Sequence, residues 1–165
     1  IFKKTFLSVI KKYDVEINLN LKYNIKTKNK NEILKALEKN EQNDIKRGRT
    51  SIGPHLDDIV LLWNDKNIRT YGSQGEHKLA LFLLKVSEML FLKEQTGSFP
   101  ILLLDDLFAK IDLERSIKIV TILNKIGVDQ KTKAQTIITT TDILNVEKSG
   151  LLKDYNKTKT IKLER

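Results

Sequence analysis

The chain has 165 residues, a formal net charge of +9 and no cysteine. That length allows one ordinary domain or parts of two. The absence of cysteine excludes a disulfide framework and a thiolate metal site, and no run of residues has the length of a membrane span or the pattern of a signal peptide. We therefore expect a cytoplasmic protein without a membrane partner. Because the chain begins at Ile1 and has one methionine, Met89, we expect a C-terminal fragment of a longer protein.

The positive charge is concentrated at the N-terminal end. Residues 1–50 hold 13 Lys and Arg against 6 Asp and Glu, whereas residues 51–165 hold 17 against 15. Such an asymmetry indicates a contact with a polyanion near the N-terminal end. A lysine-rich solvated surface, produced by a general compositional bias, explains it equally well.

The first 50 residues predict a helix, a strand and a second helix. Apolar residues at helical spacing predict an amphipathic helix over residues 1–13. Strict alternation of apolar and polar residues predicts a long antiparallel strand over residues 15–25. A helix is expected over residues 32–43, and a basic stretch follows it at residues 46–49.

A turn and a hairpin come next. Gly53 and Pro54 indicate a turn over residues 51–58, in which His55 and Asp57 are more readily explained as hydrogen-bonding groups than as metal ligands. Residues 59–63 predict a short strand with residues 68–71 as its hairpin partner. The pattern then changes, which predicts a boundary between an α+β lobe at residues 1–70 and an α/β lobe at residues 71–165.

A small, glycine-containing turn opens the helix predicted over residues 79–92, which has only three polar residues and should be buried nearly all round. The helix start could bind an anion, and Gly75 would let a phosphate approach the backbone. Ser73 and Glu76 have the spacing of a capping box, which is compatible with that use. The Gly72–Gly75 spacing also matches the loop of a KH-type RNA module, but the KH strand order is missing.

Four consecutive aliphatic residues precede Asp105 and Asp106. A short, unbroken apolar run at residues 101–104 predicts a strand that is buried on both faces of a parallel sheet. Ligands bind beyond the carboxyl ends of such strands, so the two carboxylates could hold a divalent cation and orient a water molecule. The alternative is a core strand that ends in an acidic turn.

The rest of the chain continues the alternation of helices and strands. We expect a helix over residues 113–126 capped by Gly127, a polar loop at residues 128–133, a buried strand over residues 135–141 and an exposed strand over residues 158–163. From Ser73 onward this order is half of a doubly wound α/β unit. The sequence contains no Gly-x-x-x-x-Gly-Lys-Ser/Thr phosphate loop. A nucleotide would therefore need a cradle from sequence outside these 165 residues or from another chain.

Four features stand in one order: the turn at residues 51–58, the glycine loop at residues 72–78, the acidic strand and the threonine strand end at residues 139–142. Together they resemble the C-terminal half of the RecF family of bacterial recombination proteins, which are ABC-type ATPases related to the SMC proteins. The similarity runs from about Arg49 to Asp142. It implies an α/β fold, namely the C-terminal half of a P-loop ABC-type ATPase head with a parallel-sheet core, without its Walker A half.

The resemblance implies roles for two groups of residues. Ser73, Gln74 and Gly75 resemble the ABC signature motif, which contacts the γ-phosphate of ATP held by the opposite protomer. The end of the acidic strand resembles a Walker B segment, in which Asp105 would help to hold Mg²⁺. Asp106 would then be the carboxylate that polarises the attacking water.

Two further positions follow from the resemblance, and two segments depart from it. Asp112 would face the dimer partner as part of a D-loop, and Thr141 lies near the switch position. Residues 76–78 replace the more usual Gln-Gln-Arg, and residues 109–110 replace a Ser-acidic pair. Both departures leave the fold unaffected and bear on hydrolysis rate and dimer affinity.

The function implied is that of an ATP-dependent DNA-binding protein of recombinational repair, replication and the SOS response. It would form an ATP-driven homodimer on double-stranded or gapped DNA, with recombination mediator proteins as partners and Lys46, Arg47 and Arg49 as DNA contacts. The fragment alone is not expected to hydrolyse ATP. One alternative is a structural DNA-binding or loader-interaction module whose chemistry has decayed. A weaker one is a Mg²⁺-dependent phosphatase or nuclease that adds Asp112 and Asp142 to the two strand-end acids.

Overall fold

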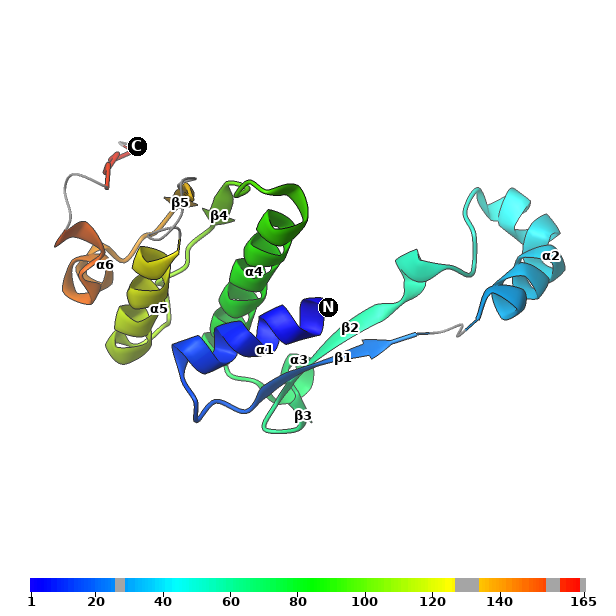
Figure 1. The fold of residues 1–165 in the computed structure, drawn as a ribbon, viewed down its shortest axis with the longest axis horizontal. Helices are drawn as coiled ribbons and strands as arrows, with labels where there is room; N and C mark the ends of the chain where they lie inside the picture. The colour runs from blue at the N-terminus through cyan, green and yellow to red at the C-terminus, as the bar shows by residue number, and fades with distance from the viewer. Residues whose placement is uncertain (26–28, 127–133, 154–157, 164–165) are drawn as a thin grey trace.

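The structure, a computed structural model, describes residues 1–25, 29–126, 134–153 and 158–163. Its elements in chain order are α1 (Phe2–Tyr13), β1 (Leu19–Asn24), α2 (Lys30–Arg47), η1 (Pro54–Leu56), β2 (Asp58–Trp63), β3 (Lys66–Asn67), α3 (Ile68–Tyr71), α4 (Gln74–Thr96), β4 (Leu102–Leu104), α5 (Leu113–Lys125), β5 (Thr136–Ile138), α6 (Ile143–Ser149) and η2 (Leu151–Lys153). We call α1 and the elements from α3 onward the body, and β1, α2, η1 and β2 the arm. The arm extends from the body and carries α2 at its far end (Figure 1).

The arm is built on an antiparallel pair of strands. β1 pairs with β2 from Leu19 opposite Trp63 to Asn24 opposite Asp58. Leu19 and Leu21 are buried at the base of the arm, and the outer half of β1 is exposed. The predicted antiparallel strand is therefore confirmed, but it runs from Leu19 to Asn24 rather than over residues 15–25. The predicted alternation of buried and exposed side chains holds only at its base, since Tyr23 is exposed.

Helix α2 is longer than the predicted residues 32–43 because both ends are capped. The Asn29 side chain accepts a hydrogen bond from the Glu32 N–H at 2.8 Å and so starts the helix. Gly48 ends it in the left-handed conformation, with φ at 65°. Lys46 and Arg47 thus lie in the last helical turn rather than in a loop.

The predicted hairpin partner at residues 68–71 is wrong. Asn64 and Asp65 both have positive φ and form a tight turn, so β3 pairs with β2 only through Lys66 and Asn67. The chain then enters the single helical turn α3, which begins where the Asn67 side chain accepts a hydrogen bond from the Arg69 N–H. Ile68 is buried in the core and favours this turn over an extended strand.

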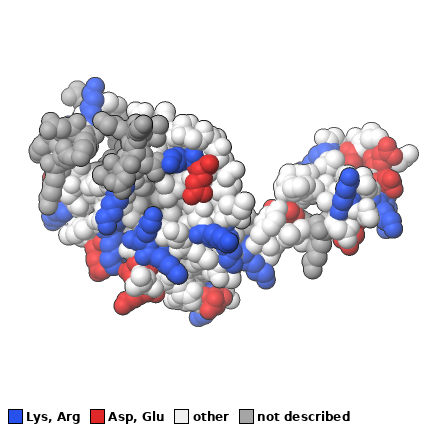
Figure 2. Space-filling view, in the orientation of Figure 1, with Lys and Arg blue, Asp and Glu red and all other residues white. Residues whose placement is uncertain are grey.

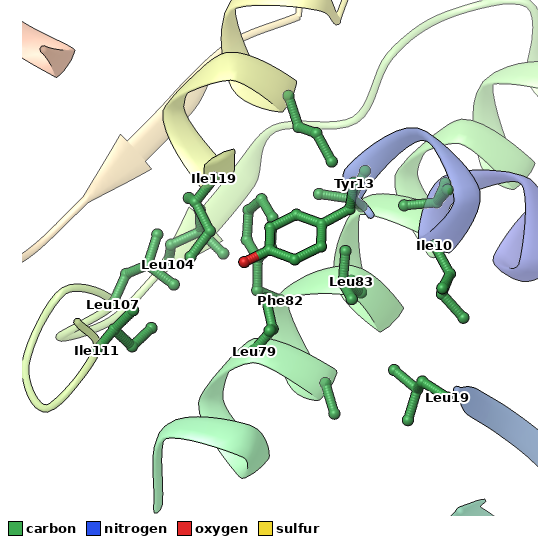
Figure 3. Packing of buried hydrophobic residues seen from close by; sticks show 14 of the residues in the cluster. Ile10, Tyr13, Leu19, Leu79, Phe82, Leu83, Leu104, Leu107, Ile111 and Ile119 are labelled. Carbon is green, nitrogen blue, oxygen red and sulfur yellow. The ribbon is translucent and has the colours of Figure 1, made fainter. Parts of the chain in front are cut away.

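The core of the body lies where α1 crosses α4, with β4 and α5 beside them (Figure 3). Its largest fully buried side chains are Phe6, Phe82 and Phe108. The Tyr13 ring packs in the same cluster. The division into lobes near Tyr71 stays a prediction, while α1, from the N-terminal end, shares this core with α4.

The two strands of the body run parallel, which confirms the α/β fold class. Leu102, Leu103 and Leu104 of β4 pair with Thr136, Ile137 and Ile138 of β5. The prediction that the acidic strand is buried on both faces is wrong for this chain. Leu102 and Leu104 are buried, whereas Leu103 is 66% exposed because no described element covers that face.

The C-terminal elements differ most from expectation. Helix α5 ends at Lys125, and the predicted cap Gly127 and loop at residues 128–133 lie outside the described residues. Helix α6 was not predicted; the Asp142 side chain caps it by accepting the Asn145 N–H at 3.0 Å. The strand predicted over residues 158–163 is wrong, because these residues form neither helix nor strand. No helix in the described ranges is long and apolar enough to cross a membrane.

Candidate functional site

The candidate site is the carboxyl end of β4, where Asp105 and Asp106 leave the sheet. The Thr139 N–H donates to the Leu104 carbonyl at 3.0 Å, so the ends of β4 and β5 stay together beyond the paired residues. Asp106 has φ at 47°, in the left-handed region that residues with a side chain seldom adopt. The backbone therefore turns sharply at the second carboxylate.

Thr139 fixes both acids. Its hydroxyl donates to Oδ1 of Asp105 at 2.5 Å and accepts the backbone N–H of Asp106 at 2.9 Å. Sequence reasoning noted the threonine strand end but assigned no role to Thr139. The contact could have been predicted from the parallel register of the two strands. Ile138 pairs with Leu104, so the residues that follow them, Thr139 and Asp105, lie next to each other.

Asp106 receives two further contacts. Lys78 Nζ donates to the Asp106 carbonyl oxygen at 2.7 Å and lies 3.1 Å from Oδ2. The Thr141 hydroxyl donates to Oδ1 at 3.4 Å, which is long for a hydrogen bond. The structure thus brings the predicted Thr141 and the unassigned Lys78 to the same carboxylate.

Ser73 starts α4 with the expected capping box. Its hydroxyl accepts the Glu76 N–H at 3.2 Å, and the Glu76 carboxylate accepts the Ser73 N–H at 2.8 Å. Gln74 and Gly75 occupy the first turn, where backbone N–H groups have no partner within the helix. This first turn therefore carries the positive end of the helix dipole.

Gly75 packs closely against neighbouring atoms at this helix start. A Cβ at this position would lie 3.2 Å from Nη1 of Arg115 and 3.3 Å from the carbonyl oxygen of Lys110. Lys110 itself has a left-handed backbone, with φ at 63°. The first turn of α4 is therefore packed against the loop that follows the acidic strand.

Asp112 caps α5 in this structure. Its Oδ1 accepts the Arg115 N–H at 2.9 Å, and its Oδ2 lies 3.4 Å from Nε of the same arginine. The loop before it is fastened by Asn145, whose amide donates to the carbonyls of Phe108 and Ile111 at 3.2 and 2.9 Å. Sequence reasoning missed Asn145 because it lies on the unpredicted α6.

The acids available to a cation at this site are few. Across the described ranges, no group of three or more His, Asp or Glu side chains could hold a metal ion. Asp112 and Asp142 both cap helices. Asp105 and Asp106 are thus the acidic pair at the strand end, which suits a Mg²⁺ ion that takes one or two carboxylates and completes its shell with phosphate and water.

The turn at residues 51–58 is held by hydrogen bonds, as expected. His55 faces Thr50, with 3.2 Å between Nε2 and the hydroxyl, and the Tyr23 hydroxyl donates to Asp57 at 2.5 Å. This contact raises the pKa of Tyr23, because the neighbouring carboxylate favours the protonated phenol. The next acid, Asp58, pairs with Arg69 at 3.2 Å.

The predicted DNA contacts lie in the arm, away from the acidic strand end (Figure 1). Lys46, Arg47 and Arg49 are all exposed. Helix α2 as a whole carries five Lys and Arg against four Asp and Glu, and both signs are visible over it in Figure 2. The basic character of the arm is therefore concentrated at the C-terminal end of α2.

Tyr13 and Asp14 join α1 to α5. Lys118 Nζ lies 2.7 Å from Oδ2 of Asp14 and 3.0 Å from Oε1 of Glu114. The hydrogen bond from Lys118 holds the pKa of Asp14 below its usual range and raises that of Lys118 itself. Burial raises the pKa of Tyr13 to about 12.

Two solved structures share this arrangement of elements. The recombination mediator protein RecF in the RecFOR pathway, solved as RecF-ATP, matches with a TM-score of 0.57 and 28% identity over 86% of this chain and 39% of that chain. A RecF-ATPrS structure gives a TM-score of 0.55 and 29% identity over the same shares. The class of the chain is therefore the RecF-type ATPase fold.

Curated relatives agree with this class. Proteins described as "DNA replication and repair protein RecF" match at 40% identity in Limosilactobacillus reuteri (strain DSM 20016), over 69% of this chain and 29% of the relative. The Streptococcus uberis relative is 44% identical over 69% of this chain and 29% of the relative. The Clostridium novyi relative is 38% identical over 78% of this chain and 35% of the relative. No family model matches. The chain spans about a third of the length of these relatives. The matches confirm the resemblance and are consistent with a partial RecF, C-terminal half.

Proposed function

We propose that this chain supplies the Walker B and signature parts of a RecF-like, ATP-dependent DNA-binding ATPase of recombinational repair and replication-fork maintenance. One observation carries the proposal: Asp105 and Asp106 are fixed at the end of a parallel strand by Thr139, Lys78 and Thr141. The RecF-ATP structure with the same fold supports ATP as the ligand.

Each site residue has a role in this proposal. Asp105, with one oxygen engaged by Thr139, would contribute to the Mg²⁺ shell, and the ion would neutralise charge on the phosphates. Asp106 would accept a hydrogen bond from the attacking water and orient it. The start of α4, at Ser73, Gln74 and Gly75, would offer N–H groups to the γ-phosphate of ATP held by the partner protomer.

The two remaining positions concern the dimer. Asp112 would contact the partner from the loop after the acidic strand, in addition to capping α5. Thr141, 3.4 Å from Asp106, would occupy the switch position and tighten onto the carboxylate when nucleotide binds. In phosphoryl transfer such positioning and charge neutralisation account for most of catalysis.

The chain alone is not expected to hydrolyse ATP. Its 165 residues contain no phosphate-loop motif, so the cradle for the phosphates would come from elsewhere in the full-length protein. ATP would first stabilise a homodimer, and DNA binding would respond to the dimer state. The DNA would be double-stranded or gapped, mediator proteins of the pathway would bind the complex, and the location would be cytoplasmic.

The test is Asp106→Asn in the full-length protein. Asparagine keeps the size of the side chain and removes its charge, so ATP-driven dimerisation should persist while turnover falls about a hundredfold, or ~2.7 kcal/mol of barrier. Steady-state hydrolysis with and without double-stranded DNA measures this, and sedimentation follows the dimer. Unchanged turnover would reject the role of Asp106.

The second candidate, a structural module with decayed chemistry, is favoured by the loop after β4. Lys110 places a positive charge with a left-handed backbone where the family has an acidic residue. Absence of ATP hydrolysis by the unmodified full-length protein, together with intact DNA binding, would select this candidate. A phosphatase or nuclease has less support, because Asp112 and Asp142 are engaged as helix caps.

A further inference from the structure

Lys78 connects two elements that are separate in the sequence. It lies one turn into α4, and Asp106, 28 residues later, follows β4. The side chain of Lys78 is 29% exposed and that of Asp106 is 47% exposed. The contact is therefore partly sheltered by the body.

The contact with Lys78 helps to hold the unusual backbone conformation of Asp106. Its φ of 47° is unfavourable for a residue with a Cβ, so other groups must hold it. Lys78 donates to its carbonyl at 2.7 Å, and Thr139 accepts its N–H at 2.9 Å. Two hydrogen bonds from different elements thus hold the turn, and the turn determines where the carboxylate lies.

We propose that Lys78 is a positioning residue for ATP hydrolysis: it holds Asp106 in the conformation from which its carboxylate orients the attacking water. The inference rests on the proposed function, in which Asp106 has that role. A lysine suits the task because its ammonium group has three donors and can bond the carbonyl and the carboxylate together.

The same contact joins two half-sites within one chain. In the proposed function, Ser73 and Gly75 at the start of α4 would face a nucleotide of the partner, whereas Asp106 would act on the nucleotide of its own chain. Lys78 follows them on the same helix. Lys78 is therefore the residue of this helix whose contact reaches the acidic strand end from the signature side.

Lys85 is the matched control for Lys78. It is a lysine of the same helix, and its Nζ lies 2.7 Å from Oε2 of Glu88, one turn along α4. Its ion pair is therefore local to the helix and leaves β4 untouched. Replacing Lys85 removes the same charge from α4 without affecting Asp106.

The experiment compares the variants Lys78→Met, Lys78→Arg and Lys85→Met in the full-length protein. Each variant is made in two backgrounds, one that keeps Asp106 and one that carries Asp106→Asn. Lys78→Met should lower kcat about tenfold and leave the KM for ATP within about twofold, because only positioning in the transition state is lost. Lys78→Arg should recover at least half of the rate, and Lys85→Met should change neither value. With Asp106→Asn, Lys78→Met should lower kcat by less than about twofold.

Two outcomes would overturn the inference. One is a kcat for Lys78→Met that equals that of Lys85→Met. The other is an equal loss of kcat in both Asp106 backgrounds. An unmodified protein without ATP turnover is instead a failure of the proposed function. Melting temperatures without nucleotide then decide, since Lys78→Met should lower Tm more with Asp106 than with Asp106→Asn, and an equal lowering rejects the link.

Discussion

The acidic end of β4 and the basic end of α2 differ in how their charged groups are held. Asp105 and Asp106 receive hydrogen bonds from three elements or their flanking residues, through Lys78, Thr139 and Thr141. Lys46 and Arg47 sit in the last turn of an exposed helix at the end of the arm. The carboxylates are held by contacts from the body, whereas the basic side chains of α2 are exposed to solvent.

The difference matches the two kinds of ligand proposed. Phosphoryl transfer depends on fixed geometry, so its carboxylates need a packed body behind them. Attraction to DNA phosphates acts through long-range charge and tolerates flexible lysines and arginines. The same contrast predicts that mutations in the body and in the arm will affect different measurements.

The largest effect is expected for Phe82→Ala in the body. Phe82 is 1% exposed and lies at the centre of the core in Figure 3. Its loss leaves a cavity and should lower the free energy of unfolding by ~3–5 kcal/mol. Leu34→Ala in α2, where the side chain is 47% exposed, should cost less than ~1 kcal/mol.

Denaturant unfolding, with hydrogen exchange resolved to α4 and α2, measures both variants. Equal costs would contradict the comparison, because they would show that α2 is as tightly packed as the body.

The next effect is expected for Ser73→Arg in the full-length protein. A bulky cation at the start of α4 should block ATP-driven dimerisation, with the dimer dissociation constant raised at least ~100-fold, while ATP binding persists. The variant also loses the α4 cap, which costs ~1 kcal/mol. Ser73→Asn keeps a capping side chain and serves as the control.

Sedimentation with and without ATP decides the role of Ser73. Dimers of Ser73→Arg at the concentration found for the unmodified protein would show that this helix start lies outside the interface.

A smaller effect is expected for charge reversal at Lys46, Arg47 and Arg49. If all three contact phosphates, the slope of log affinity against log salt should become less steep by about 2 to 3. Reversal of three other lysines of α2 is the matched control: Lys30, Lys35 and Lys39. Equal losses of DNA affinity in the two triple variants would show that the arm acts only through its general positive charge. A change in the ATPase rate without DNA would show that the arm and the body are not functionally separate.

Much of the acidic site could be predicted because local chemistry sets it. The capping box at Ser73 follows from Ser and Glu at the right spacing, and an apolar run ending in two acids identifies the strand end. The parallel pairing of β4 and β5 follows from the helix between them. These features depend on neighbours in the sequence or on simple topology.

The remainder depends on tertiary contacts that periodicity does not report. Lys78 appears in the sequence as one more lysine on a helix, and only packing brings it to Asp106. Residues 68–71 have strand-like composition, yet the buried Ile68 and the Asn67 cap favour a helical turn. The exposure of Leu103 could not be read from an apolar run, because exposure depends on what covers the strand.

The smallest effect is expected for Tyr13→Phe, at the junction of α1 and α5. The Tyr13 hydroxyl is buried and has no hydrogen-bond partner among the described residues, so its removal should change stability at pH 7 by less than ~1 kcal/mol, and toward stabilisation. Burial raises the pKa of Tyr13 from 10.0 to about 12. Folding therefore favours the neutral phenol.

Below pH 10 the phenol is neutral in both the folded and the unfolded state, so its ionisation does not affect stability there. As the pH rises from 10 toward 12, the unfolded state ionises first and the folded protein loses stability. The phenylalanine variant should lose less stability than the unmodified protein across that interval. Unfolding at pH 8 and pH 11 gives the comparison, with Tyr71→Phe as control because Tyr71 is 70% exposed. If Tyr13→Phe and Tyr71→Phe respond alike between the two pH values, the junction of α1 and α5 is open to water and the body is less closed than its packing indicates.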